Sequence, residues 1–458
     1  MPTYERPRRA PTAPTAPAGL AAREAAAALL AAVVDRRDSL DRLLDEMNGL
    51  DRWRRLAPRD RALARAIATT ALRQRGRIAA AFARLTDRPP PARARHLGHV
   101  LHVAAAQILF LDVPASAAVN LAVAALAGEP RSSRFSGFAN AVLRRMCRER
   151  EALLALPADA ATVFPGWLAR RLVADHGRRR ADAIAAMVLC RPVLDLTAHP
   201  RLGRAERAAL GEALGATVLP TGSLRLADPR PVAELPGFAD GAWWVQDAAA
   251  SLPARLIGDV AGLAIADLCA APGGKTAQLA AAGARVTAVD ISPTRLARLA
   301  DNLARLRLSA EVVAADILAW QPPRRFDAVL LDAPCSATGT LRRHPDIAWN
   351  KTADDVAALV ELQRRMIGAA AAMVRPGGLL VYANCSILKS EGEDLLAGLL
   401  AADRRLSVVP VAAAEIGGEA AWINGQGALR TLPCDLPREP ACTGGLDGFF
   451  ACRLRVGG

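Results

Sequence analysis

Lysine is nearly missing from this chain of 458 residues, which carries three lysines against 56 arginines. Lys275, Lys351 and Lys389 all lie in the C-terminal half. An arginine side chain is a planar fork of donors, whereas the lysine ammonium is a compact point charge. In a chain that uses arginine almost everywhere else, a lysine within a loop therefore indicates a position that needs a compact charge. Lys275 is such a position, because it lies in a loop of small residues.

Long apolar runs are also missing. The longest uncharged apolar stretch near the start, residues 25–34, is too short to span a bilayer. It continues into DRRDSLDRLLDEM, where leucines recur at helical spacing, so a core helix is expected there. We therefore expect a cytoplasmic protein without a membrane segment.

The eight cysteines form no CxxC pair, so they suit neither a zinc site nor a small disulfide scaffold. We expect free thiols, which are typical of a reducing compartment. His96, His99 and His102 recur every third residue. Six positions turn a helix by about 600°, so the three side chains do not share one face. No metal site is expected.

Positive charge is concentrated at the N-terminal end. Residues 1–150 hold 26 arginines against 13 acidic residues, whereas the whole chain has a net charge of +14. The N-terminal part therefore carries almost all of the excess, which indicates contact with a polyanion such as RNA. The alternative is that these arginines only solvate helix surfaces.

The hydrophobic pattern changes along the chain. Residues 1–18 are predicted to be a disordered tail, and residues 19–151 a helical bundle with apolar residues at three-four spacing. Residues 152–240 are less regular and predict a small linker domain. In residues 241–458 apolar strands alternate with helical segments, which predicts a doubly wound α/β sheet. The closing DGFFACRLR predicts a further strand, expected at an edge of that sheet.

The loop DLCAAPGGKT, residues 267–276, lacks the glycine patterns of the common phosphate-binding loops. A GxGxxG dinucleotide fingerprint is absent, and Cys269 stands where a Walker A loop requires glycine. Its small residues still allow a ligand to approach the backbone closely. Aspartates end four successive predicted strands, which favours a nucleoside with a cationic sulfonium, S-adenosylmethionine. The predicted cofactor-binding residues are Cys269, Ala270, Ala271, Pro272, Gly273, Gly274, Lys275, Asp290, Asp316 and Asp332.

Two cysteines follow the ends of predicted strands. Cys335 lies in LLDAPCSATG and Cys385 in YANCSILKSEGE. A single cysteine in a strand is more often a buried hydrophobic residue than a reactive thiol. Two thiols beside a nucleoside pocket instead indicate covalent chemistry on an electrophilic ring. Methyl transfer to carbon 5 of a cytosine in RNA fits this pattern, because a thiolate that adds to carbon 6 activates carbon 5.

These motifs, together with WWVQDAAASL and the closing GGLDGFFACRLR, resemble those of the RsmB/Nop/Sun family of S-adenosylmethionine-dependent RNA cytosine-5 methyltransferases. RDRALARAIATTALR and FANAVLRRM resemble the NusB-type RNA-binding domain. The resemblance covers nearly the whole chain after the tail. It implies an N-terminal NusB-like bundle, a small linker domain and a Rossmann-like class I methyltransferase domain. It also implies small-subunit (16S) ribosomal RNA as substrate, a monomeric enzyme, and no membrane partner.

The resemblance assigns Cys385 as the nucleophile and Cys335 as the thiol that assists release of the product. DNA cytosine methyltransferases attack with the cysteine after proline, so exchanged roles are the rival assignment. Asn384 stands where the family usually has threonine. Asp332 is expected to donate, as the protonated acid, to the ring nitrogen or amino edge of the base, and Lys275 to orient Asp332 and lower nearby thiol pKa values.

Three other functions fit the sequence less well. A non-catalytic RNA-binding protein would not need both thiols. An amino-methylating enzyme requires DPPY or NPPY where this chain has DAPC, and a dehydrogenase requires the missing glycine fingerprint. A cytosine-5 methyltransferase acting on tRNA or another RNA remains an alternative.

Overall fold

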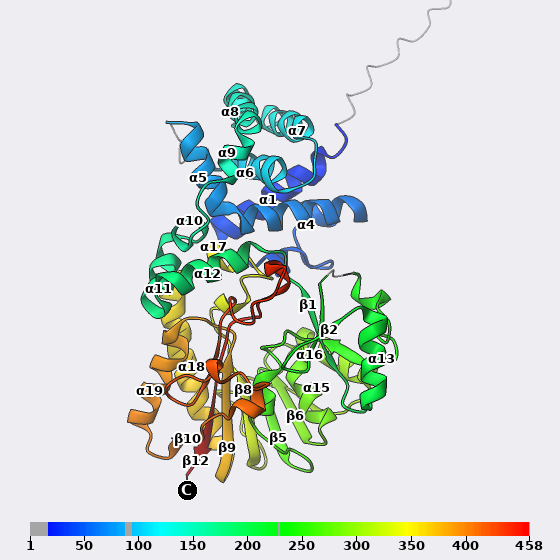
Figure 1. Ribbon diagram of the computed structural model, residues 1–458, viewed down its shortest axis with the longest axis vertical. Helices are drawn as coiled ribbons and strands as arrows, with labels where there is room; N and C mark the ends of the chain where they lie inside the picture. Colours follow the sequence, from blue (N-terminus) through cyan, green and yellow to red (C-terminus); the bar gives the residue numbers. More distant parts are fainter. Residues whose placement is uncertain (1–16, 88–93, 228–229, 458) are drawn as a thin grey trace, which may run out of the picture. The chain divides into compact units, whose positions relative to one another are not determined.

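The computed structural model describes residues 17–87, 94–227 and 230–457. Tertiary contacts divide the chain into two units, Met1–Pro157 and Ala158–Gly458 (Figure 1). The predicted tail lies almost entirely outside the described residues, as do the prolines at positions 89–91. Within the described residues, no helix combines the length and apolarity needed to cross a bilayer.

The first unit is entirely helical where it is described, as the three-four spacing predicted. Helix α6 is its centre, because most of its side chains are buried, including Leu97, Val100, Ala104 and Ile108. The other long helices pack their alanine-rich and leucine-rich faces around it. The helices are α1 (Leu20–Arg36), α2 (Leu40–Leu43), α3 (Asp51–Arg54), α4 (Pro58–Arg73), α5 (Arg75–Leu85), α6 (Arg95–Phe110), α7 (Ala115–Ala127), α8 (Ser136–Arg148) and α9 (Arg150–Leu154).

The second unit begins with three helices and a small antiparallel sheet of strand order β2-β3-β1-β4. A bidentate ion pair between Arg225 and Asp195 joins β3 to β1, with both donor–acceptor distances at 2.7 Å. Helix α13 packs Leu214 against this sheet. The elements are α10 (Ala160–Val163), α11 (Gly166–His176), α12 (Arg178–Leu189), β1 (Leu194–Ala198), α13 (Arg204–Leu214), β2 (Thr217–Val218), β3 (Leu224–Leu226) and β4 (Trp243–Val245).

The large sheet has the order β10-β12-β9-β8-β5-β6-β7, with β11 paired to β12. Strands β9, β8, β5, β6 and β7 are parallel, as the alternation of strands and helices predicted. The prediction of an edge position for the last strand is wrong. Strand β12 runs antiparallel between β9 and β10 (Figure 1), because every position but two of its FFACRLRV is buried. The strands are β5 (Ala264–Leu268), β6 (Arg285–Asp290), β7 (Glu311–Ala314), β8 (Phe326–Asp332), β9 (Val374–Asn384), β10 (Leu406–Val408), β11 (Leu429–Thr431) and β12 (Phe449–Val456).

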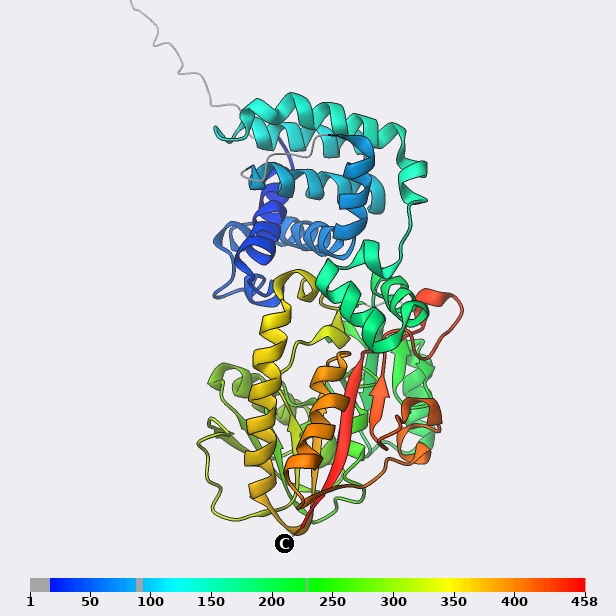
Figure 2. The ribbon, with the colours of Figure 1, turned by 90° about the vertical axis from the view of Figure 1, so that its left-hand side faces the viewer.

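Helices cover both faces of this sheet. One face packs against α18 (Ala353–Met373) and α19 (Glu393–Ala402), which stand side by side in front of the strands in Figure 2. The other face packs against α14 (Leu252–Arg255) and α15 (Gly274–Ala281). Alternate residues of β5 point to opposite layers, since Leu268 belongs to the first core and Ile265 to the second. Both faces are thus buried, as in other doubly wound sheets.

The expectation that all cysteines are free is wrong for two of the eight. Cys190, at the end of α12, forms a disulfide with Cys442. The two lie 252 residues apart in sequence, yet their Cα atoms are 5.3 Å apart. Only the folded chain brings them together, so their spacing carried no signal. The other six cysteines are free thiols.

Candidate active site

The predicted cofactor loop joins β5 to α15 at the carboxyl edge of the sheet, where the strand order reverses between β5 and β8. Cys269 takes a positive φ of 59° and Gly273 one of 101°. The Ala270 amide donates to the Val289 carbonyl at 3.0 Å. Burial raises the pKa of the Cys269 thiol to about 12, so this cysteine is not a nucleophile.

Asp290, at the end of β6, is tied to this loop. Its Oδ2 accepts from the Ala271 amide at 3.2 Å, and its Oδ1 accepts from the Ser292 amide at 3.0 Å. Oδ2 also lies 3.4 Å from Arg295 Nη1, whereas Oδ1 retains a second lone pair. Asp290 therefore holds the loop in place and can still accept a hydroxyl.

Asp316 differs from the other predicted carboxylates. It lies two residues beyond β7, is exposed, and accepts from the Leu318 amide at 3.0 Å. The structure places it at the correct edge of the sheet, but shows no bond between it and the loop of residues 269–274.

Asp267 was recognised only as one of four aspartates that end strands. Its Oδ2 accepts from Thr276 Oγ1 at 2.6 Å, whereas its buried Oδ1 has no hydrogen-bond partner among the described residues. Burial raises the pKa of Asp267 to about 7. An unpaired buried acceptor beside the loop fits a ligand that brings a positively charged donor, such as the amino group of a methionine moiety.

Lys275 and Asp332 come together as predicted. Lys275 Nζ donates to Asp332 Oδ2 at 2.7 Å, across the mouths of β5 and β8. Asp332 accepts from the lysine here, whereas the expected bond from Asp332 to the base stays a prediction. Asp332 raises the pKa of Lys275 against the opposing effect of burial. The same ammonium lies 5.2 Å from the centre of the Phe449 ring.

Phe449 was not predicted as a site residue, although it lies in DGFFACRLR. This segment was expected only as a further strand at an edge of the sheet. Its insertion as β12 beside β9 instead brings the aromatic ring to the lysine.

The two predicted thiols are neighbours. Cys335 Sγ and Cys385 Sγ lie 3.4 Å apart, and both side chains are partly exposed. Cys385 follows the last residue of β9, and Cys335 follows β8 by three residues. The pKa of Cys335 is raised well above its usual value by its bond to Cys385, by burial and by the nearby charge of Glu391. Lys275 is not among these causes, and its expected lowering of thiol pKa values stays a prediction.

Glu391 is a second residue that sequence reasoning missed. It is fully buried in the turn η4 (Lys389–Glu391), and its carboxylate accepts from the residue after each cysteine, Ser336 and Ser386. The sequence offered one signal for Glu391, an acidic residue in the YANCSILKSEGE motif that was singled out for Cys385. Asn384 also bonds locally, because its Oδ1 accepts from the Ser386 amide at 2.9 Å.

Comparison with known proteins identifies the chain. The family described as 16S rRNA methyltransferase RsmB/F matches residues 259–455, and the NusB family matches residues 20–148. A ribosomal RNA small subunit methyltransferase B of Vibrio cholerae is 39% identical over 81% of this chain and 86% of its own length. The chain belongs to the RsmB/F family. A relative with the same name from Xanthomonas campestris is 37% identical over 95% of the chain and 97% of its own length.

A solved structure supports the fold of this RsmB/F protein. A methyltransferase homologue from Pyrococcus horikoshii, 24% identical, superposes with a TM-score of 0.53 over 64% of this chain and 95% of its own. The match to the NusB family confirms the predicted NusB-like bundle, and this superposition confirms the Rossmann-like fold of the catalytic sheet. The cofactor of this methyltransferase is S-adenosylmethionine. The residues present fit it, since the buried Asp267 Oδ1 is without a donor and Asp290 keeps acceptor capacity.

Proposed function

We propose that this protein transfers a methyl group from S-adenosylmethionine to carbon 5 of a cytosine in small-subunit (16S) ribosomal RNA. The observation that carries the proposal is the pair of thiols 3.4 Å apart at the ends of β8 and β9, beside the Lys275–Asp332 pair. Methyl transfer to a nucleophilic nitrogen would need neither thiol. The names of the relatives support ribosomal RNA as the substrate.

Covalent catalysis explains why the reaction needs a nucleophilic cysteine. Carbon 5 of cytosine is a poor nucleophile, so the Cys385 thiolate first adds to carbon 6, and the ring becomes an enamine that is nucleophilic at carbon 5. Bound S-adenosylmethionine supplies an electrophilic methyl group. Once carbon 5 carries the methyl group, loss of its proton returns the electron pair that expels Cys385 and restores the aromatic ring.

The second thiol serves the release step. Cys335 is held beside the nucleophile, and its raised pKa keeps it a neutral thiol at neutral pH. A neutral thiol at 3.4 Å can donate to the sulfur of Cys385 as that sulfur leaves carbon 6. A thiol that is held neutral is a poor nucleophile, which supports Cys385 as the nucleophile over the exchanged assignment.

The side of the pocket that faces the target base consists of Lys275, Asp332 and Phe449. We propose that Asp332 accepts from the cytosine amino group and that the Lys275 ammonium stabilises charge on the ring during thiolate attack. Carbon 6 is inaccessible in a stacked helix, so the target cytosine must be unpaired or flipped out. The arginine-rich first unit offers phosphate contacts for the surrounding RNA.

Mechanism-based trapping tests the proposal. Fluorine at carbon 5 cannot leave as a proton would, so RNA that contains 5-fluorocytosine should stay bound to the wild-type enzyme through denaturing electrophoresis. Cys385→Ala should give no adduct and no methylation. Cys335→Ala should accumulate an adduct with unmodified RNA. An adduct on Cys385→Ala would exchange the two roles, and failure of the wild type to form one would refute covalent catalysis.

The substrate needs a separate measurement. Bisulfite sequencing of ribosomal RNA should lose one 5-methylcytosine signal in cells without this protein, and the signal should return with the wild-type gene. An unchanged 16S pattern with a lost signal in tRNA would move the substrate to that RNA class.

A further inference from the structure

We propose that Glu391 is a positioning residue that sets the separation of the two active-site cysteines by binding the residue after each of them. The proposal rests on the proposed function, because it gives both sulfurs a task. Among the described residues, the Glu391 carboxylate forms hydrogen bonds to the cysteine loops and to Gln363, and to neither sulfur. Its action would therefore run through the two cysteine loops.

The Glu391 carboxylate accepts hydrogen bonds from both cysteine loops. Oε2 accepts from Ser336 Oγ at 2.5 Å and from Ser386 Oγ at 2.6 Å. The short distances are typical of hydroxyls that donate to a carboxylate. The two hydroxyls also lie 3.1 Å from each other, so one oxygen atom of Glu391 joins the loop after β8 to the loop after β9.

The residues before the two cysteines also belong to the hydrogen-bond network of Glu391. Gln363 donates both to Glu391 Oε1 and to the carbonyl of Pro334, the residue before Cys335, each at 2.9 Å. Asn384, the residue before Cys385, donates to the Glu391 carbonyl at 2.7 Å. Each cysteine is therefore held on both sides by groups that bond to Glu391.

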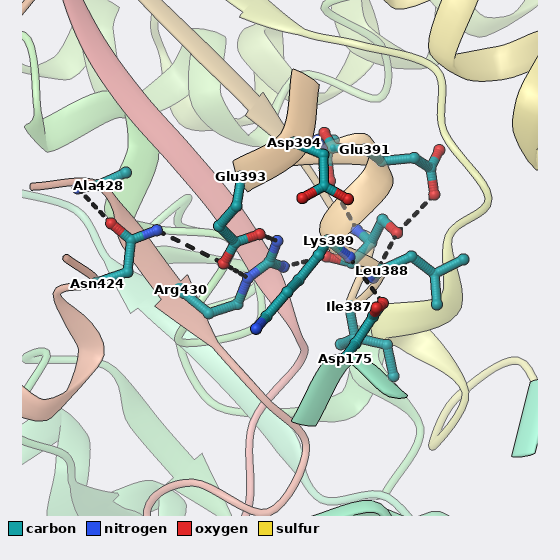
Figure 3. Close-up of polar contacts among 12 residues, drawn as sticks. Asp175, Ile387, Leu388, Lys389, Glu391, Glu393, Asp394, Asn424, Ala428 and Arg430 are labelled. Atoms are coloured by element: carbon teal, nitrogen blue, oxygen red, sulfur yellow. Dashed lines mark hydrogen bonds and ion pairs between the residues drawn. The ribbon is translucent and has the colours of Figure 1, made fainter. Parts of the chain in front are cut away.

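Glu391 has no ion-pairing role among the described residues that would explain its carboxylate. Among the described residues the carboxylate of Glu391 forms no ion pair, and its four donors are the Ser336 amide, two hydroxyls and the Gln363 amide. The neighbouring Glu393 differs, since it pairs with Arg430 at 2.6 Å. Figure 3 shows the Glu393 carboxylate directed at Arg430 and the Glu391 carboxylate on the other side of the turn.

Burying an acid costs free energy that a neutral side chain would avoid, so a purely structural link needs no carboxylate. A carboxylate at this place has one advantage. It offers only acceptors, and can therefore bind donors from both loops at once. Its charge also contributes to the raised pKa of Cys335.

The test compares Glu391→Gln with Glu415→Gln. Glu415 is a matched control, because it accepts from Arg453 at 2.7 Å and bonds neither cysteine loop. The glutamine side chain has one acceptor oxygen. That oxygen can accept either from the two serine hydroxyls or from the Ser336 and Gln363 amides, but not from both sets. We expect Glu391→Gln to bind S-adenosylmethionine within about twofold of wild type and to methylate RNA about 100-fold more slowly, the effect of a shift of about 1 Å in reacting groups. Glu415→Gln should keep wild-type turnover.

A dithiol probe reads the sulfur separation without RNA. Phenylarsine oxide condenses with two adjacent thiols and releases water, so it should bind the wild type tightly and Cys335→Ala weakly. Glu391→Gln should lose about tenfold or more in this affinity, because the second thiol is no longer held beside the first. Arsenical affinity and turnover both equal to wild type would overturn the proposal. If instead the wild type forms no RNA adduct, covalent catalysis fails while the arsenical result still decides the role of Glu391.

Two smaller changes keep the test valid if Glu391→Gln does not fold. Ser386→Ala removes the bond to the nucleophile loop, and should slow adduct formation with fluorinated RNA by about tenfold. Ser336→Ala removes the bond to the Cys335 loop, and should slow release of product from the adduct by a similar factor. Both rates within twofold of wild type in both variants would show that the network does not position the thiols.

Discussion

Gly273 lies directly against Leu299: a Cβ atom on Gly273 would stand 2.8 Å from Leu299 Cγ. Leu299 is fully buried on α16 (Pro293–Leu306), which Ser292 caps by accepting from the Arg295 amide. The helix after β6 therefore supports the cofactor loop from behind. The combination of this contact with a φ of 101° explains why glycine stands here.

Gly273→Ala should shift the cofactor loop. The positive φ and the contact with Leu299 together should cost about 2–3 kcal/mol of stability. We expect weaker S-adenosylmethionine binding by isothermal titration calorimetry, with unchanged affinity for RNA. Gly273→Ala combined with Leu299→Ala relieves the contact but not the strained φ, so it should not restore cofactor binding. Full restoration would show that the contact alone matters.

Lys275→Met tests the charge beside the thiols. Methionine keeps most of the length and removes the ammonium that Asp332 and Phe449 contact. Single-turnover methylation should fall by about 100-fold, as for the loss of one electrostatic donor at a reacting group. Lys351→Met is the control, because Lys351 belongs to none of these contacts. A Lys275→Met enzyme with wild-type turnover would remove the ammonium from the mechanism.

The catalytic sheet was predictable because its parallel strands are largely apolar runs, and aspartates lie at or near the carboxyl ends of β5, β6, β7 and β8. The same regularity located Asp290, Asp332 and the two thiols, since the carboxyl ends of neighbouring parallel strands meet at one edge. The helical unit was equally plain from its three-four spacing. In these regions the local pattern and the tertiary structure agree.

The misses have a different physical origin. The place of β12 depends on antiparallel pairing with β9, which alternation within one strand does not specify, and Phe449 was missed with it. The Cys190–Cys442 disulfide joins two loops far apart in sequence. The sequence shows an acidic residue at position 391, but the sequence pattern could not show that the Glu391 side chain is buried beneath both cysteine loops.

Cys190→Ser should destabilise the oxidised protein. The disulfide closes a loop of about 250 residues, and a crosslink stabilises by about 2–4 kcal/mol through restriction of the unfolded chain. We expect a lower Tm for Cys190→Ser and for Cys442→Ser, and no further loss in the double variant. Reduction of the wild type with dithiothreitol should give the same Tm as the variants. An equal Tm for all oxidised forms would show that the disulfide contributes nothing to stability.

Asp267 should make the stability of the protein depend on pH. Its pKa rises from 3.8 to about 7 on folding because the carboxyl is buried, so the folded chain holds this proton more tightly than the unfolded chain. This contribution is complete below about pH 4, and is lost as the pH rises to about 7. Asp267→Asn keeps an acceptor for Thr276 and removes the titration. Urea unfolding without cofactor should therefore show a decline between pH 4 and 7 that is smaller in the variant by up to about 4 kcal/mol. Parallel pH profiles for the two proteins would mean that Asp267 titrates alike in the folded and unfolded chains.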